Sequence, residues 1–124
     1  MNDDFSEFSS WPPPEKTKML IRSKWSPGLS PQSGAALYWF FYNQLYYDLN
    51  LVDNPRMLLV RYESVVSNPE VEINRVCDFL QIEFRPELAK GVFASSISRD
   101  PPPRIEPPIR ECCEELWLRL CSEN

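Results

Sequence analysis

The sequence predicts an α/β fold that is mostly helical and contains one strand of the parallel type. The strand is expected at residues 57–60, an apolar Met-Leu-Leu-Val run that follows an Asp-Asn-Pro turn signal at 53–55. An apolar run without polar alternation is typical of a strand buried on both faces, as in a parallel sheet. A polar loop over 61–67 and an amphipathic helix over 69–80 are predicted next, which gives the strand, loop and helix of an α/β unit.

The helix predicted at residues 69–80 has clear start signals. Asn68 is a candidate N-cap, and Pro69 occupies the first helical position. The first turn carries two carboxylates, which the helix dipole favours there. The apolar face that follows consists of Ile73, Val76, Phe79 and Leu80. We expect this face to pack against the sheet.

Three further helices are expected. Ser30-Pro31 opens a helix that runs to about Leu49, and apolar and aromatic residues cover most of its circumference. A short helix is predicted over residues 85–94, and a last one from Pro107 to about Cys121. The brief apolar run at residues 19–21 is interpreted as a short strand.

The composition divides the chain and excludes several classes of function. Residues 1–29 are an acidic, proline-rich lead-in that we expect to be flexible, and residues 30–124 form the folded part. A net charge of −5 argues against nucleic-acid binding, although a local pocket for one small anion remains compatible with it. The chain has no histidine, and its four cysteines form no CxxC pair, so we expect no metal site.

The same composition predicts a cytoplasmic protein. The N-terminus is acidic where a secretory signal would be basic and apolar. No apolar run reaches the roughly 20 residues of a membrane span. Buried thiols in a reducing compartment are a better reading of the four cysteines than a disulfide framework.

A block between residues 56 and 82 resembles bacterial-type sulfotransferases that use the donor 3′-phosphoadenylyl sulfate (PAPS). The matching residues are Arg61-Tyr62-Glu63, Val65-Val66, Asn68-Pro69 and Phe79-Leu80. Ser64 stands where this family usually has Asp, and Gln81 where it usually has Gly. The competing interpretation is an ordinary strand–loop–helix joint of an α/β protein. The resemblance extends over residues 34–120 and implies the C-terminal half of a partial P-loop-like sulfotransferase fold.

The resemblance also implies which residues contact the donor. Tyr62 would contact the adenine, and Ser95, Ser96 and Ile97 would line it from a later loop. A Tyr at the carboxyl end of a parallel strand points into the ligand crevice of an open sheet, although a Tyr that caps the core has the same sequence. Arg99 is close enough in sequence to pair with a phosphate, or it is a solvated loop residue.

Two parts of the family's chemistry are not recognisable in the sequence. The family binds the phosphosulfate with a Gly-, Ser- and Thr-rich loop that carries a basic residue. Ser30-Pro31-Gln32-Ser33-Gly34 has a similar order but lacks the basic residue and the preceding strand. No general base is visible either, so no catalytic residue is assigned.

The sequence therefore predicts a fragment of an enzyme that moves a sulfuryl group to an acceptor hydroxyl or amine and is inactive alone. Its expected partners are the donor, an acceptor, and an N-terminal half or a second copy bound through the 37–49 face. The alternative is a non-catalytic helical module that binds another protein. A phosphate loop encoded upstream in frame would favour the enzyme.

Overall fold

The computed structural model of the protein describes residues 14–92 and 101–123, and within these ranges the secondary structure is entirely helical. The chain divides into two compact units. The first unit combines Met1–Asn54 with Pro102–Asn124, and the second unit is Pro55–Pro101.

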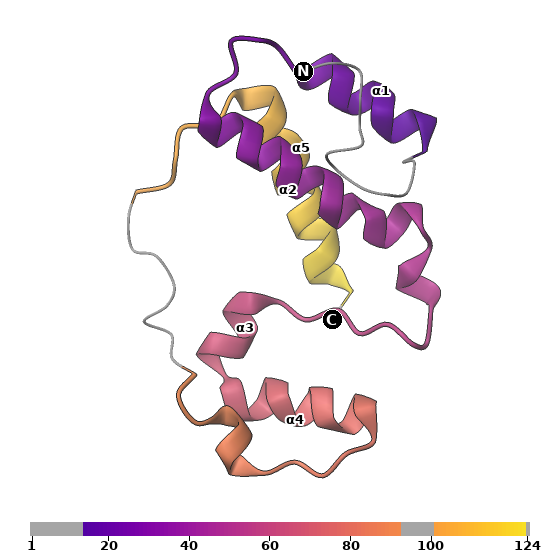
Figure 1. Ribbon diagram of the computed structural model, residues 1–124, viewed down its shortest axis with the longest axis vertical. Coiled ribbons are helices and arrows are strands. Elements are labelled where there is room, and N and C mark those ends of the chain that lie inside the picture. Colours follow the sequence, from indigo (N-terminus) through magenta and orange to yellow (C-terminus); the bar gives the residue numbers. More distant parts are fainter. Residues whose placement is uncertain (1–13, 93–100, 124) are drawn as a thin grey trace. The chain divides into compact units, whose positions relative to one another are not determined.

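Three α-helices and a short 3-10 helix make up the described part of the first unit: α1 (Glu15–Lys24), α2 (Pro31–Asp48), η2 (Leu51–Asp53) and α5 (Pro107–Ser122). Figure 1 shows α2 lying across α5, with α1 beside α2. The core consists of Ile21 from α1, Leu37 and Phe41 from α2, and Ile109 from α5, and all four side chains are buried. Each helix therefore contributes its apolar stripe to one small core.

Helices α2 and α5 run in the same direction. The Glu106 N–H, just before α5, donates to Ser33 Oγ near the start of α2 at 2.9 Å. One level further along, the Cys113 thiol donates to the Ala36 carbonyl at 3.3 Å. At the far end, the Tyr47 hydroxyl donates to Glu123 at 3.1 Å. Residue numbers rise together along both helices, so the pairing is parallel.

The second unit contains α3 (Tyr62–Ser67), α4 (Pro69–Leu80) and the 3-10 helix η3 (Pro86–Ala89). Helix α4 packs against both α3 and η3. The buried apolar side chains of the second unit are Val66, Cys77 and Ala89, one each from α3, α4 and η3. This core is small, and Phe79 and Leu80 on the predicted apolar face of α4 stay exposed.

The predicted strand and the α/β, P-loop-like fold class are wrong for the described residues. Residues 57–60 form neither a helix nor a strand. A parallel strand needs neighbours that bond its backbone groups, and the described residues supply none. Met57 and Val60 are 43% and 38% exposed, so the apolar run is not covered on both faces.

Other expectations had mixed outcomes. The helices predicted over 30–49, 69–80 and 107–121 are confirmed within two residues. The predicted loop at 61–67 is instead helix α3, and the predicted strand at 19–21 belongs to helix α1. Of the helix predicted over 85–94, the described residues 85–92 contain only the short helix η3.

The domain boundary at residue 30 stays a prediction. Residues 1–13 lie outside the described part of the chain, and residues 15–24 of the expected lead-in form α1. Among the described helices, none has the length and apolar character that crossing a membrane requires.

Candidate functional site

Tyr62, the residue expected to contact adenine, opens helix α3 and does not end a strand. The backbone is extended at Arg61, with φ −94° and ψ 130°, and becomes helical at the next residue. The Tyr62 side chain is 56% exposed, so it does not cap the core of the second unit. Its ring is available to a ligand, but its contact with adenine stays a prediction.

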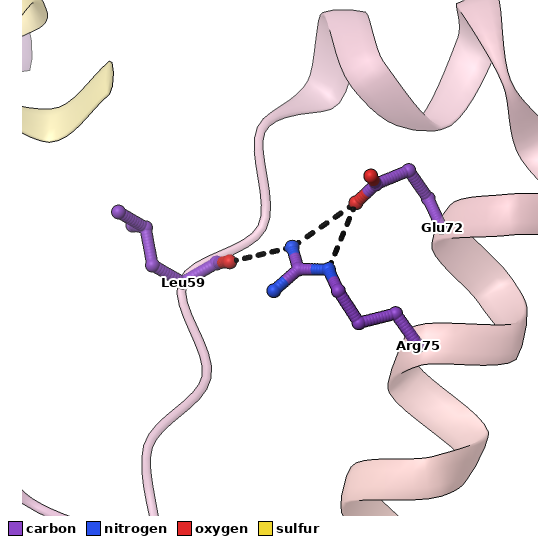
Figure 2. A network of polar contacts seen from close by, with 3 residues as sticks. All are labelled: Leu59, Glu72 and Arg75. Carbon is purple, nitrogen blue, oxygen red and sulfur yellow. Dashed lines mark hydrogen bonds and ion pairs between the residues drawn. The ribbon is translucent and has the colours of Figure 1, made fainter. Parts of the chain in front are cut away.

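Arg75 on α4 fixes the segment that leads to Tyr62. Its Nη2 donates to the Leu59 carbonyl at 2.9 Å, and both Nη2 and Nε donate to Glu72 Oε2, at 3.0 and 3.3 Å (Figure 2). Glu72 lies one turn before Arg75 on the same helix, so the ion pair orients the guanidinium toward the segment. The Leu59 carbonyl, which has no strand partner, is bonded in this way.

The other predicted donor contacts, Ser95, Ser96, Ile97 and Arg99, lie outside the described residues. The pocket that was expected to join Tyr62 and Ser96 around the adenine therefore stays a prediction.

The Ser-Pro-Gln-Ser-Gly segment at 30–34 has a structural role. Ser30 is the N-cap of α2, and its Oγ accepts the Ser33 N–H at 3.1 Å. Ser33 is fully buried, and its Oγ accepts from the Ser30 hydroxyl and from the Glu106 N–H. Both hydroxyls are thus used to start α2 and to anchor the start of α5.

Asp48 is the one carboxylate in α2, and both of its oxygens accept hydrogen bonds. The Thr17 hydroxyl of α1 donates to Oδ2 at 2.6 Å, and Gln44 Nε2 donates to Oδ1 at 3.2 Å. Beside them is a cavity of about 310 Å³, which charged groups of both signs line, including Lys16, Glu115 and Arg119. One oxygen of Asp48 joins α1 to α2 and the other bonds within α2, so Asp48 acts as a structural carboxylate.

A second polar cluster closes the far end of the α2–α5 pair. The guanidinium of Arg119 lies 3.5 Å from the ring centroid of Tyr47, a cation–π contact. Desolvation and the hydrogen bond to Glu123 raise the pKa of the Tyr47 hydroxyl. Tyr47 therefore stays neutral at pH 7 and serves as a hydrogen-bond donor.

An apolar groove of about 530 Å³ lies between α2 and α5. The lining residues of this apolar groove are Gln32, Ala35, Ala36 and Trp39 from α2, Cys113, Glu114 and Trp117 from α5, and Pro103 and Ile105 from the preceding segment. Sequence reasoning missed the groove, because nothing in either helix alone indicates that the two pair. The helical spacing of Trp39 from Ala35 and of Trp117 from Cys113 was the available signal.

Cys113 is the thiol in this groove, and it is poorly suited to nucleophilic chemistry. Burial, followed by the negative charge of its neighbours, raises the pKa of the Cys113 thiol to about 11. None of the four cysteines forms a disulfide. Within residues 14–92 and 101–123, no group of three or more His, Cys, Asp or Glu side chains is arranged to hold a metal ion.

Comparison with known proteins agrees with the resemblance carried by the Tyr62 block. A family model described as "Sulfotransferase family" matches residues 16–86, more than half of the 124 residues. No curated protein and no solved structure gives a significant match. The matched range runs from α1 to the first residue of η3 and includes Tyr62 and Arg75. The chain belongs to the sulfotransferase family.

Proposed function

We propose that the chain is the C-terminal part of a bacterial-type sulfotransferase, which moves a sulfuryl group from PAPS to an acceptor hydroxyl or amine. The observation that carries this proposal is the family match over residues 16–86, which contains the whole Arg61-Tyr62-Glu63 block. A cytoplasmic location is part of the proposal and is supported by four thiols without a disulfide.

The proposed role of Tyr62 is to pack on the adenine of the donor. An aromatic ring can stack on a base whatever secondary structure presents it, and the Tyr62 ring is more than half exposed. Arg75 supports this role indirectly, because it holds the segment before Tyr62 against α4. Ser95, Ser96, Ile97 and Arg99 complete the proposed donor site.

The remaining chemistry must come from residues beyond these 124. Sulfuryl transfer requires groups that cradle the phosphosulfate and a base that removes the acceptor proton. Ser30 and Ser33 are engaged in helix capping, Asp48 is engaged in structural hydrogen bonds, and the chain has no histidine. We therefore propose that an N-terminal half supplies the phosphosulfate loop and the base, and that the chain alone is inactive.

Calorimetric titration of the purified chain with 3′-phosphoadenosine 5′-phosphate, the donor product, tests whether the phosphate-binding groups lie outside these 124 residues. We expect weak binding or none, because the phosphate-binding loop of the family is not recognisable in these 124 residues. Tight, stoichiometric binding would contradict the proposed division, since it would require a phosphate site within the chain.

The role of Tyr62 is tested in the longer enzyme by Tyr62→Ala and Tyr62→Phe. Loss of the ring should weaken donor binding by about 1–3 kcal/mol, the scale of base–aromatic stacking, whereas Phe should retain most of the affinity. Acceptor affinity should change little. Tyr38→Ala is the matched control, because Tyr38 is also an exposed tyrosine on a helix but lies outside the block. Equal effects of Tyr62→Ala and Tyr38→Ala would refute the assignment.

A second candidate function is a non-catalytic interaction module, and the apolar groove is the observation that favours it. Self-association is a related proposal. Leu37 and Phe41 of the 37–49 face are buried in the core, so a second copy would use the exposed Tyr38, Tyr42 and Leu49. The sequence encoded upstream discriminates between the functions. An in-frame Gly-, Ser- and Thr-rich loop supports the enzyme, and a complete domain of another type supports the module.

A further inference from the structure

The apolar groove has the dimensions and the composition of a site for a small organic molecule. Its volume of about 530 Å³ lies within the range of known ligand sites, which is about 300–1,000 Å³. Aromatic and aliphatic side chains make up most of its lining, and only a few polar groups interrupt them. Such a lining favours a ligand with a flat apolar body.

The groove exists because small residues on the two helices are followed, about one helical turn later, by large ones. Cys113 of α5 bonds to the Ala36 carbonyl, so these two residues mark one level of the pair. Ala35 and Ala36 leave space at this level. Trp39 and Trp117 follow three and four residues later, which is about one helical turn. The groove is therefore lined by two alanines and, about one turn further along, by one indole from each helix.

Glu114 is the only charged residue among those that line the groove. Its Oε1 lies 3.4 Å from Arg110 Nε in an exposed ion pair, which is a weak interaction in water. A carboxylate has about four acceptor positions, so Glu114 can take a second cationic partner. The indole faces of Trp39 and Trp117 also favour a cation over an anion.

From these features we propose that the apolar groove binds a small aromatic amine, with its rings against Trp39 and Trp117 and its ammonium group at Glu114. The charge at Glu114 also disfavours a second copy of the chain as occupant, because that copy brings a net charge of −5. The proposal concerns binding alone and does not rest on sulfuryl transfer.

Three probes with the same ring system test the ligand chemistry: 2-(1-naphthyl)ethylamine, 2-(1-naphthyl)ethanol and 1-naphthylacetate. Calorimetric titration of the full chain at pH 7 should give the tightest binding for the protonated amine and the weakest for the acetate. The amine should bind about two- to fivefold more tightly than the alcohol, the scale of an exposed ion pair. Added salt should reduce this difference. Glu114→Gln should remove this difference, because the amide has no charge to pair with the ammonium group.

The location of binding is tested by filling the groove. Ala35→Phe adds a ring at an exposed lining position, so the core is not disturbed, and it should weaken binding of all three probes at least about tenfold. Leu118→Phe is the matched control, because Leu118 is 68% exposed on α5 and does not line the groove. Circular dichroism verifies that both variants keep their helices.

Several results would overturn the proposal. These are no binding of any probe, equal affinities for the amine, alcohol and acetate, or an unchanged affinity in Ala35→Phe. Sedimentation gives a further check. A dimeric chain that becomes monomeric on Ala35→Phe would mean that a second copy, and not an amine, occupies the groove.

Discussion

Removing the Ser33 hydroxyl should destabilise the first unit more than removal of any exposed hydroxyl. Ser33 is fully buried, and its Oγ accepts the Glu106 N–H at 2.9 Å and the Ser30 hydroxyl at 3.1 Å. The bond to Glu106 joins residues 73 positions apart and anchors the start of α5 to α2. Ser33→Ala leaves two donors without this acceptor, so we expect a loss of about 1–3 kcal/mol in the free energy of unfolding.

Urea unfolding followed by tryptophan fluorescence measures this loss. No tryptophan lies between residues 55 and 101, so the signal reports on the first unit and not on the second. With a urea m-value of about 1–3 kcal/mol/M, a loss of about 2 kcal/mol lowers the midpoint by roughly 1 M. The m-value should stay the same.

Ser122→Ala is the matched control. The Ser122 hydroxyl donates to the Arg119 carbonyl at 2.6 Å at the exposed end of α5, and its removal should cost less than about 0.5 kcal/mol. Ser30→Ala should cost about 1 kcal/mol as the loss of an N-cap. Because Ser30 and Ser33 bond to each other, their double variant should lose less than the sum of the two. If Ser33→Ala is no worse than Ser122→Ala, the anchoring argument fails.

Three further perturbations test other parts of the structure. Burial raises the pKa of Cys113 to about 11, so its alkylation rate, followed by mass spectrometry, should rise about tenfold per pH unit between pH 8 and 10. An alkylation rate that stops rising below pH 9 would contradict this. Because the folded state favours the neutral thiol, the stability this group contributes is present below pH 9 and is lost as pH rises through about 11. Thr17→Val removes the 2.6 Å hydrogen bond to Asp48 and should lower the free energy of unfolding, measured with urea, by about 1–2 kcal/mol. An unchanged free energy would show that α1 is held by its apolar contacts alone. Arg75→Lys keeps the charge but loses the guanidinium fork, so amide hydrogen exchange at residues 57–60 should accelerate severalfold, and unchanged exchange would refute the role of Arg75.

The helices that the sequence predicted correctly are those with local start signals. Ser30-Pro31, Asn68-Pro69 and Pro107 mark starts that the structure reproduces. A cap or an N-terminal proline acts on the turn that contains it, so its effect does not depend on the rest of the fold. Long amphipathic segments with such signals are therefore readable from a single sequence.

The features that sequence reasoning missed depend on partners distant in the chain. An apolar run such as 57–60 becomes a strand only when another strand bonds its backbone, and no local signal supplies that information. The apolar groove likewise requires α2 and α5, which are separated by the whole second unit, to pair in parallel. Helix α1 was missed because Lys and Arg flank its apolar residues, yet Ile21 on it is fully buried.

The error in fold class did not carry over to the family, because the two inferences used different residues. The strand rested on the apolar run at 57–60, which any sheet protein can share. The family rested on Arg61-Tyr62-Glu63 and on Phe79-Leu80, whose order and spacing are more specific. Tyr62 and Leu80 are both more than half exposed, so packing within the second unit does not explain why these residue types stand there. Exposed residues that match a family motif are better indicators of function than of fold. For this reason the Tyr62→Ala experiment measures donor binding.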